Sequence, residues 1–450
     1  MYDLIIIGSG PGGIFSAFEA IKINPNLKIA IFESGKELSK RIPKKDIMRG
    51  FGGAGAFSDG KYNITNEFGG TLYTHIGHKQ ALELMYYVDE INLKFGAHDT
   101  HLYHNESTHL KKICLQNKLE LLSASVRHLG TDINYIVLEN LYNHLVNRGI
   151  TFYFETPIQT INKLETGYEV ITKDNNSYKA NYCIISTGRS GSRWMGEICQ
   201  KLNIETQSNR VDIGVRVELP YEIFSHLTDE LYESKIVYKT AKYQDKVRTF
   251  CMNPHGEVVA ENTNGILTVN GHSYENPELY TQNTNFALLV SNHFTQPFKD
   301  SNGYGESIAR LSNMLGGGVI VQRFGDLIRG QRSNETRIRE NFVTPTLQAT
   351  PGDLSLVIPK RQLDDIIEMI YQLDKVAPGT ANDDTLLYGV EVKFYNLEVA
   401  VDENLETIHK GLFVIGDCSG VTHSLSHASA SGVHVARYIS NKLNHPSISF

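Results

Sequence analysis

Three glycines near the N-terminus, Gly8, Gly10 and Gly13, have the G-x-G-x-x-G spacing of a loop that binds a dinucleotide pyrophosphate. In such a loop the second glycine lets the backbone approach the phosphates, and the third lets a helix pack closely on a strand. Glu33 follows about 20 residues later, where an acidic side chain can accept hydrogen bonds from the hydroxyls of an adenosine ribose. These residues could therefore bind and orient a dinucleotide.

The segments around these residues predict the elements that would position them. Tyr2 to Ile7 is an apolar run typical of a strand buried on both faces. Residues 12–22 predict a helix whose first N–H groups would face the pyrophosphate, and residues 27–32 predict a second strand that ends at Glu33. This order of elements indicates a βαβ unit.

Two later strands end in residues of the same kind. Residues 182–186 predict a strand that continues into Thr187-Gly188, and residues 412–415 predict one that continues into Gly416-Asp417. A helix is expected over residues 424–443. Ligands of open α/β sheets bind at the carboxyl ends of the strands, so both segments could reach the same dinucleotide.

A glycine-rich segment at residues 50–61 repeats the spacing G-x-G-x-x-G. No strand is expected before it and no amphipathic helix after it, so we interpret it as a loop whose backbone approaches a flat ligand. Ser58, Asp59 and Lys61 are its polar side chains near that ligand. The alternative is that the loop holds the ligand while these three side chains face solvent.

The middle of the chain has a different character. From about residue 205 short β-rich segments are separated by turns such as Pro254-His255-Gly256 and Asn264-Gly265, which predicts a mostly antiparallel sheet. Helices are expected over residues 305–315 and 361–373. We predict a nucleotide-binding domain made of residues 1–205 and 405–450, with a substrate-binding domain at residues 206–404 inserted between its parts.

Composition restricts the function. The chain has 450 residues, 41% of them hydrophobic, and a net charge of −7, which disfavours nucleic acid and anionic lipid as partners. The five cysteines are widely spaced and form no metal-binding pattern, which favours a reducing cytoplasm and no metal. No segment approaches the length of about 20 apolar residues that a membrane span needs. A small-molecule substrate is expected, and the oligomeric state is left open.

With these residues in view, the sequence resembles the flavoproteins with two dinucleotide-binding domains, related to glutathione reductase and to the aromatic hydroxylases. Within them it is most similar to a group of FAD-dependent dehydrogenases. The matching segments are GSGPGG, Glu33 with Arg41, GGAGAFSDGK, STGRSG, FCMNPHGEVV, TVNGHSY and FVIGDCSG. The resemblance implies an α/β fold, a Rossmann-type FAD-binding domain with an inserted β-rich (α+β) substrate domain.

The resemblance also implies a set of FAD contacts. The pyrophosphate would lie on residues 8–13, the adenosine ribose near Glu33 and Ser34, and Arg41 near the adenosine or pyrophosphate. The remaining contacts would come from the glycine loop, from the two later strand ends and from the last helix. The cofactor-binding residues expected are Gly8, Gly10, Pro11, Gly12, Gly13, Glu33, Ser34, Arg41, Gly53, Ala54, Gly55, Ser58, Thr187, Gly188, Gly416, Asp417 and His427.

Flavin N5 exchanges hydride, so the protein has to orient a substrate and to supply charge or a proton. The catalytic candidates are Ser58, Asp59, Lys61, His423 and His427. The two histidines would share one helix face if the helix already includes both; each could instead be a capping or packing residue. Arg248, Arg329 and Arg332 are candidate donors to a substrate carboxylate, although most arginines form surface ion pairs.

We therefore expect an FAD-dependent oxidoreductase that transfers hydride between flavin N5 and a small or medium organic substrate. NAD(P)H, if used, would bind transiently, because no second nicotinamide fingerprint is present. A flavin-dependent monooxygenase is one alternative, although the Asp-Gly pair of the hydroxylases is replaced by Arg189-Ser190-Gly191. The other is a flavin-binding module that modifies a macromolecule such as tRNA or acts as a redox sensor.

Overall fold

The computed structural model of the chain describes residues 1–43, 45–46, 48–232, 234–263, 265–274, 277–294, 298 and 300–444. Asn264, from the expected Asn264-Gly265 turn, lies outside these residues. The chain has a mixed α/β fold with several sheets.

The chain divides into two compact units, which we call unit 1 and unit 2. Unit 1 comprises residues 1–103, 124–208 and 396–450, and unit 2 comprises residues 104–123 and 209–395. The expected domain boundaries fell after residues 205 and 404. Residues 104–123 lie in unit 2 because strand β5 (Leu119–Leu121) pairs with β13 (Ile236–Lys239).

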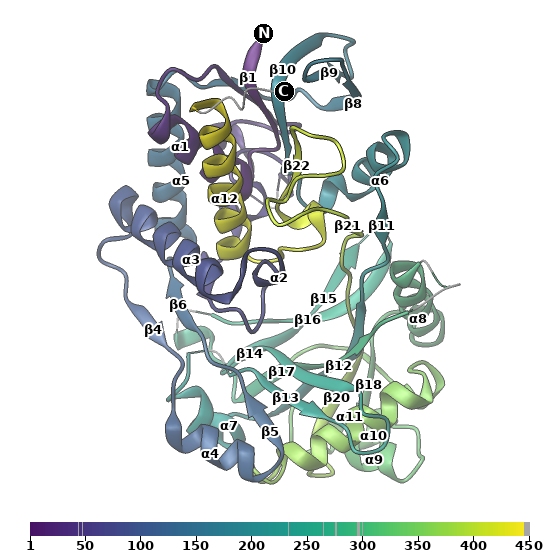
Figure 1. Cartoon of the computed structure of the whole chain (residues 1–450). Helices are drawn as coiled ribbons and strands as arrows, with labels where there is room; N and C mark the ends of the chain where they lie inside the picture. The colour runs from purple at the N-terminus through teal and green to yellow at the C-terminus, as the bar shows by residue number, and fades with distance from the viewer. Residues whose placement is uncertain are drawn as a thin grey trace. The chain divides into compact units, whose positions relative to one another are not determined.

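A largely parallel sheet runs through unit 1 (Figure 1). Its order is β7-β2-β1-β10, with β22 on the other side of β10, and every neighbouring pair in this group is parallel. Two antiparallel strands, β9 and β8, extend it. The strands are β1 (Tyr2–Ile7), β2 (Ile29–Phe32), β7 (Thr151–Tyr153), β8 (Ile158–Lys163), β9 (Tyr168–Thr172), β10 (Ser177–Ile185) and β22 (Leu412–Val414).

Alternate residues of β1 enter two different apolar clusters. Leu4 and Ile6 belong to one cluster, and Ile5 and Ile7 belong to another. Neighbouring side chains of a strand point to opposite faces, so this strand is covered on both sides. The expectation of a strand over residues 2–7 that is buried on both faces is confirmed.

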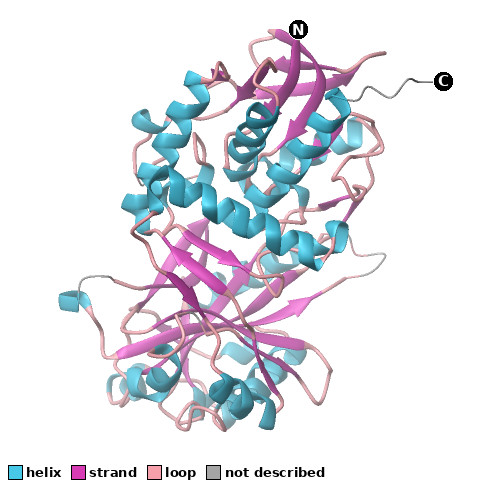
Figure 2. Ribbon diagram, turned by 60° about the vertical axis from the view of Figure 1, so that its left-hand side comes forward, coloured by secondary structure: helices cyan, strands magenta, loops and turns pink. Residues whose placement is uncertain are grey.

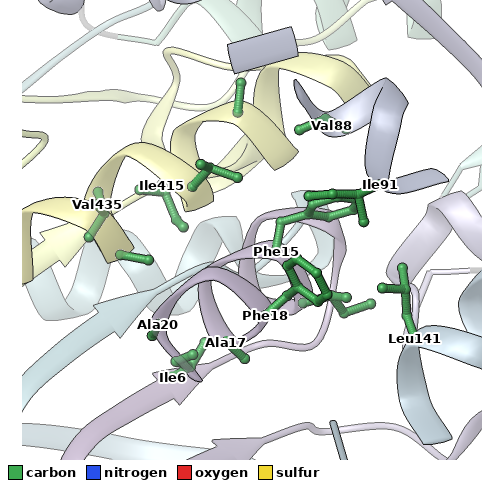
Figure 3. Packing of buried hydrophobic residues seen from close by; sticks show 14 of the residues in the cluster. Ile6, Phe15, Ala17, Phe18, Ala20, Val88, Ile91, Leu141, Ile415 and Val435 are labelled. Atoms are coloured by element: carbon green, nitrogen blue, oxygen red, sulfur yellow. The ribbon is translucent and has the colours of Figure 1, made fainter. Parts of the chain in front are cut away.

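Helices from the two ends of the chain pack together in unit 1. Figure 3 shows Phe15 and Phe18 of α1 in one apolar cluster with Val435 of α12. Ile415, which precedes α12 in the chain, belongs to the same cluster. The two helices approach closely, since a Cβ on Gly432 would lie 2.2 Å from the Gly12 carbonyl oxygen. The helices of unit 1 are α1 (Pro11–Ile23), α2 (Tyr73–Ile76), α3 (His78–Asn92), α5 (Gly130–Asn147), α6 (Ser192–Lys201) and α12 (Leu425–Asn444).

Two smaller sheets complete this part of the fold. A three-stranded sheet has the order β3-β6-β4, and a two-stranded sheet joins β11 to β21. Their strands are β3 (Lys61–Ile64), β4 (Leu102–His104), β6 (Ser125–His128), β11 (Thr206–Gln207) and β21 (Glu398–Val399).

Unit 2 is built on an eight-stranded sheet with the order β19-β18-β20-β12-β17-β14-β13-β5. All neighbouring pairs are antiparallel except β18 with β19, which confirms the expected mostly antiparallel sheet. Figure 2 shows its strands in magenta, with helices gathered along one side. The further strands of this sheet are β12 (Val211–Pro220), β14 (Lys246–Asn253), β17 (Asn283–Asn292), β18 (Ile320–Arg323), β19 (Thr350–Pro351) and β20 (Leu386–Lys393). A separate two-stranded hairpin consists of β15 (Glu257–Thr263) and β16 (Ile266–His272).

Strand β12 shows how this sheet separates apolar from polar side chains. Val211, Ile213, Val215 and Val217 enter a cluster with apolar residues of α7, α8 and α11. The residues between them, from Asp212 to Glu218, therefore point to the opposite face. The helices of unit 2 are α4 (Thr108–Gln116), α7 (Tyr221–Thr228), α8 (Ser301–Gly316), α9 (Phe324–Ile328), α10 (Glu335–Arg339) and α11 (Lys360–Leu373). Among the described residues, none of the helices is both long and apolar enough to cross a membrane.

Candidate functional site

A cavity of about 770 Å³ lies within unit 1. It is lined by the residues that follow β1, β2, β10 and β22, which are parallel strands with their carboxyl ends at one edge of the sheet. Its volume is within the range of about 300–1,000 Å³ typical of cofactor and substrate pockets. The position is the crevice in which open α/β sheets bind their ligands.

Most of the predicted cofactor-binding and catalytic residues line this cavity, although they come from five separate stretches of the chain. Gly13, Arg41 and His427 are exceptions, because they lie outside the lining. The predicted residues that line it are Gly8, Gly10, Pro11, Gly12, Glu33, Ser34, Gly53, Ala54, Gly55, Ser58, Asp59, Lys61, Thr187, Gly188, Gly416, Asp417 and His423.

The turn between β1 and α1 leaves open space on the side of the cavity. Gly8 has φ +104°, and its N–H donates to the Phe32 carbonyl oxygen at 2.8 Å. A Cβ on Gly13 would lie 2.1 Å from the Gly8 carbonyl oxygen, so Gly13 serves helix packing. By contrast, a Cβ on Gly10 would meet no described atom within 4 Å. Gly10, at the N-cap of α1, therefore borders space that a ligand can enter.

Glu33 is buried, and its carboxylate ties three turns together. Oε2 accepts hydrogen bonds from the N–H and the hydroxyl of Ser9, at 3.0 and 2.9 Å. Oε1 accepts from the N–H groups of Gly35 and Gly50, at 2.8 and 3.0 Å, and from the Ser34 hydroxyl at 3.3 Å. The long Ser34 bond is the one that a ligand hydroxyl could replace with least loss.

Arg41 lies outside the cavity lining and contacts the residues of the glycine loop that forms part of the wall. Its guanidinium donates to the carbonyl oxygens of Phe51 and Asp46, and it lies over the Phe57 ring with Cζ 4.6 Å from the centroid. Burial lowers the pKa of Arg41, against the opposing effect of Glu33 and Asp46. The structure places Arg41 as the residue that shapes the glycine loop.

The glycine loop lies against the β1–α1 turn. Gly52 has φ +82°, and its N–H donates to the Ser9 carbonyl oxygen at 2.8 Å. Residues 53–57 form a short 3₁₀ turn, and Asn134 of α5 donates to the Gly55 carbonyl oxygen at 2.7 Å. The described residues just before this segment, 45–46 and 48–49, form no strand, in agreement with its interpretation as a loop. The loop brings backbone to the cavity wall beside the start of α1, since a Cβ on Gly53 would lie 3.3 Å from the Gly10 Cα.

Three polar side chains at the start of β3 line the cavity. Asp59 and Lys61 form an ion pair with 3.1 Å between carboxylate oxygen and Nζ. Asn63, two residues further along the strand, lies on the same face, and its buried Oδ1 has no hydrogen-bond partner within the described chain. Sequence analysis missed Asn63, although the alternation from Lys61 could have identified it. Its free acceptor fits a ligand with an N–H or O–H group.

His423 and Asp417 form a pair at the cavity wall. The His423 Nδ1 lies 3.1 Å from the Asp417 carboxylate, so this nitrogen carries the proton and the carboxylate orients the ring. The other oxygen of Asp417 is 3.1 Å from Arg189 Nε. Thr422 and Ser424 flank His423 and also line the cavity. This arrangement can accept or release a proton through His423.

His427 has a different environment. It is fully buried, and its Nε2 donates to the Thr65 carbonyl oxygen at 2.8 Å. The condition that both histidines belong to the helix is not met, because α12 begins at Leu425, with the Ser424 hydroxyl accepting from the His427 N–H at 3.3 Å. Burial lowers the pKa of His427 to about 4, so it is neutral near pH 7.

Acidification should therefore destabilise the protein through His427. The unfolded state takes up a proton near pH 6.5 and the folded state only near pH 4, so folding stability falls as the pH falls between these values. We expect His427 to contribute a loss of about 2 kcal/mol between pH 7 and pH 5. Urea unfolding at both pH values measures this loss, which should be smaller by that amount in His427→Asn.

His109→Asn is the matched control, because His109 is exposed on α4. His109→Asn should show the same change in the free energy of unfolding between pH 7 and pH 5 as the unchanged protein. An identical slope for His427→Asn and the unchanged protein would contradict the assignment of His427.

The three arginines expected to bind substrate lie in unit 2. Arg248 is largely buried and donates to Asp212 and to the Tyr395 hydroxyl. Arg329 is paired with Asp383 at 2.8 Å, and the exposed Arg332 has a long 3.5 Å bond to a backbone carbonyl oxygen. Arg329 thus has the environment of a surface ion pair, whereas Arg248 belongs to a buried polar cluster.

Comparison with known proteins gives one family match. Residues 210–394, nearly the whole larger segment of unit 2, match the family described as FAD-dependent protein, C-terminal domain-like. No curated protein matches the chain.

Several solved structures are similar to the chain at a low level. The Diels-Alderase PyrE3 of pyrroindomycin biosynthesis is 11% identical, with a TM-score of 0.40, covering 99% of this chain and 66% of its own. CtdE in complex with FAD and a substrate is 10% identical, with a TM-score of 0.40 and coverage of 98% and 81%. Glycine oxidase from Geobacillus kaustophilus is 12% identical, with a TM-score of 0.39 and coverage of 98% and 95%. Likeness at this level carries no argument about the activity of this chain.

Proposed function

We propose that the chain binds FAD in the cavity of unit 1 and is an FAD-dependent oxidoreductase acting on a small or medium organic substrate. The observation that carries this proposal is the cavity itself, in which the β1–α1 turn, the glycine loop and the ends of β10 and β22 meet. The match of residues 210–394 to a family of FAD-dependent proteins supports the same cofactor. In this proposal unit 1 is a Rossmann-type FAD-binding domain and unit 2 is the inserted substrate domain.

The lining residues fit the parts of FAD. The open space beside Gly10 and the N-terminus of α1 suit a pyrophosphate, because N–H groups and the helix dipole favour an anion there. A Cβ on Gly188 would likewise meet no described atom within 4 Å, so backbone there can approach the dinucleotide. Glu33 and Ser34 would face the adenosine ribose, and Asn63 would accept from an N–H group of the ring or substrate.

When bound, the flavin supplies hydride transfer at N5. The residues of the chain have to hold the substrate, exclude water and move a proton. Lys61, paired with Asp59 at the cavity wall, provides a positive charge that can stabilise a developing negative charge. His423 is the proton carrier in this proposal, because its ring lines the cavity and Asp417 holds it in place.

The proposal also covers the electron donor and the alternative reaction, oxygen insertion. NAD(P)H is a candidate donor that would bind transiently, and the substrate domain would take a small molecule. Arg189 contacts Asp417 in the segment where the hydroxylases carry an Asp-Gly pair, which favours dehydrogenation or reduction over oxygen insertion. We place the protein in the cytoplasm, and we propose no nucleic-acid partner because of the net charge of −7.

The absorption spectrum of the purified protein tests the cofactor. We expect a yellow protein, or a colourless one that binds added FAD with one FAD per chain. Anaerobic addition of NADH, NADPH and a panel of organic donors should then bleach the flavin with at least one of them. A protein that neither carries nor binds FAD would refute the proposal. Rapid reoxidation with formation of an oxygenated product would favour the monooxygenase, and a shift of labelled tRNA at low salt would favour the macromolecule-modifying alternative.

A further inference from the structure

One face of the unit 2 sheet gathers cations around a single aromatic ring. Residues that lie directly opposite in antiparallel strands share a face. Asp212 of β12 lies opposite Lys393 of β20. Leu289 of β17 lies opposite Gly214 of β12 on one side and opposite Arg248 of β14 on the other. Since Asp212 and Gly214 are two residues apart in β12, these side chains all point to the face away from the apolar helix-covered cluster. We call it the Phe250 face, because Phe250 follows Arg248 by two residues on β14.

The Phe250 ring is approached by three cationic side chains. Lys393 Nζ lies 3.5 Å from the ring centroid, Arg248 Cζ 4.9 Å and Lys235 Nζ 5.2 Å. Strands β12 and β17 separate β20, which carries Lys393, from β14, which carries Phe250. Gly214 of β12 has no side chain on this face, so it does not obstruct the long Lys393 side chain. A ring can attract one cation, but three cations so close together repel one another unless anions are near.

The nearest carboxylate leaves donors of Arg248 and Lys393 without an acceptor. Asp212 accepts from Arg248 at 2.5 Å and also lies 3.9 Å from Arg210. The buried Nε of Arg248 has no hydrogen-bond partner within the described part of the chain. Nor does any hydrogen bond or ion pair among the described residues reach the Lys393 ammonium. Two strong donors beside Phe250 are therefore left for an acceptor from outside the chain.

The protonation of Lys393 agrees with this geometry. Burial and the neighbouring cations Arg248 and Lys235 lower the pKa of Lys393 to about 7. An anion bound beside the ammonium would raise that pKa again. The titratable and charged groups that face Lys393 are Lys235, Arg248 and Cys251 from the β13–β14 side, Asp212 from β12 and Glu391 from its own strand.

We infer that the Phe250 face binds a carboxylate, held by the Lys393 ammonium and the Arg248 Nε–H beside the Phe250 ring. A carboxylate fits because its two oxygens can accept from both donors, and because its single charge suits a cluster that already contains Asp212. As a description of the substrate this inference rests on the proposed function, since it makes the substrate of the oxidoreductase an organic acid. Of the three arginines expected from sequence, it retains Arg248.

Calorimetric titration of the purified full-length protein, with any FAD that it binds, with benzoate and with its neutral analogue benzamide tests the site. We expect benzoate to bind at least about tenfold more tightly than benzamide, and Lys393→Met to weaken benzoate binding at least about tenfold. Lys360→Met is the matched control, because Lys360 is exposed on α11 and pairs with Asp364; it should bind benzoate unchanged. Equal affinities for the two ligands, or equal affinities of the two variants, would overturn the inference.

The pH dependence of benzoate affinity gives a second test, and it does not require removal of the positive charge at position 393. In the unchanged protein the affinity for benzoate should be constant below about pH 7 and fall about tenfold per pH unit above it. Lys393→Arg keeps the charge at every pH, so its affinity should stay level between pH 6 and pH 9. Parallel profiles in the two proteins would overturn the inference. Benzoate binding is measured independently of flavin chemistry. A protein that fails to bind FAD would therefore refute the proposed function, while the benzoate titration would still test the carboxylate site.

Discussion

Replacing Gly10 by alanine should weaken FAD binding about 100-fold, or about 2.8 kcal/mol, and leave the folding stability of the apoprotein unchanged within about 0.5 kcal/mol. The added Cβ would meet no described protein atom within 4 Å, so the fold has room for it. It would occupy space at the cavity wall, where the backbone of a dinucleotide-binding loop has to approach the pyrophosphate. Fluorescence titration of the apoprotein with FAD and urea unfolding measure the two quantities.

Two further glycine variants make this prediction specific. Gly13→Ala should destabilise the apoprotein by about 1–3 kcal/mol, because its Cβ would lie 2.1 Å from the Gly8 carbonyl oxygen. Gly196→Ala is the control, since Gly196 lies in α6 outside the cavity lining and its Cβ would meet its nearest neighbour at 4.0 Å. Tight FAD binding by Gly10→Ala would show that the pyrophosphate lies elsewhere.

Replacing Glu33 by alanine should destabilise the apoprotein by about 4 kcal/mol. The carboxylate accepts hydrogen bonds from the N–H groups of Ser9, Gly35 and Gly50, and its removal leaves these donors without acceptors in a buried place. A residue that only contacted the ribose would affect FAD binding and leave apoprotein stability almost unchanged. Urea unfolding without FAD therefore separates the two roles.

Glu33→Gln should have an intermediate effect, because its amide keeps one acceptor oxygen and turns an NH₂ group toward the remaining donors. Glu139→Ala is the matched control on the exposed surface of α5 and should change stability by less than about 0.5 kcal/mol. Equal stabilities of Glu33→Ala and Glu139→Ala would contradict the interpretation of Glu33 as the residue that joins the three turns.

The parallel strands of unit 1 could be predicted from local patterns. The apolar run of β1, the glycines after it and the strand that ends at Glu33 are consecutive in sequence, and each satisfies a separate requirement of a buried βαβ unit. The ends of β10 and β22 could also be identified, because a Thr-Gly or Gly-Asp pair follows each short apolar run. That they border one cavity depends on strand order, which residue patterns alone do not give.

Other features depend on contacts between distant segments. The pairing of β5 with β13 joins a three-residue strand to a partner more than one hundred residues away, and three residues carry too little pattern to assign it. His427 and Arg41 are polar, and their orientation away from the cavity follows from the helix start at Leu425 and from the carbonyl oxygens of the glycine loop. Ser424 as the N-cap residue was the one local signal that could have separated His423 from His427.

The crossing of α1 and α12 at Gly12 and Gly432 has a consequence for biosynthesis. Synthesis proceeds from the N-terminus, so the first helix leaves the ribosome long before the helix that covers it. All of unit 2, which ends at residue 395, is available before β22 and α12 exist. Unit 2 can therefore fold during translation, whereas the face of α1 that meets α12 stays uncovered until residues 425–444 are synthesised. The nascent β1–α1 region is thus where we expect a molecular chaperone to bind this protein.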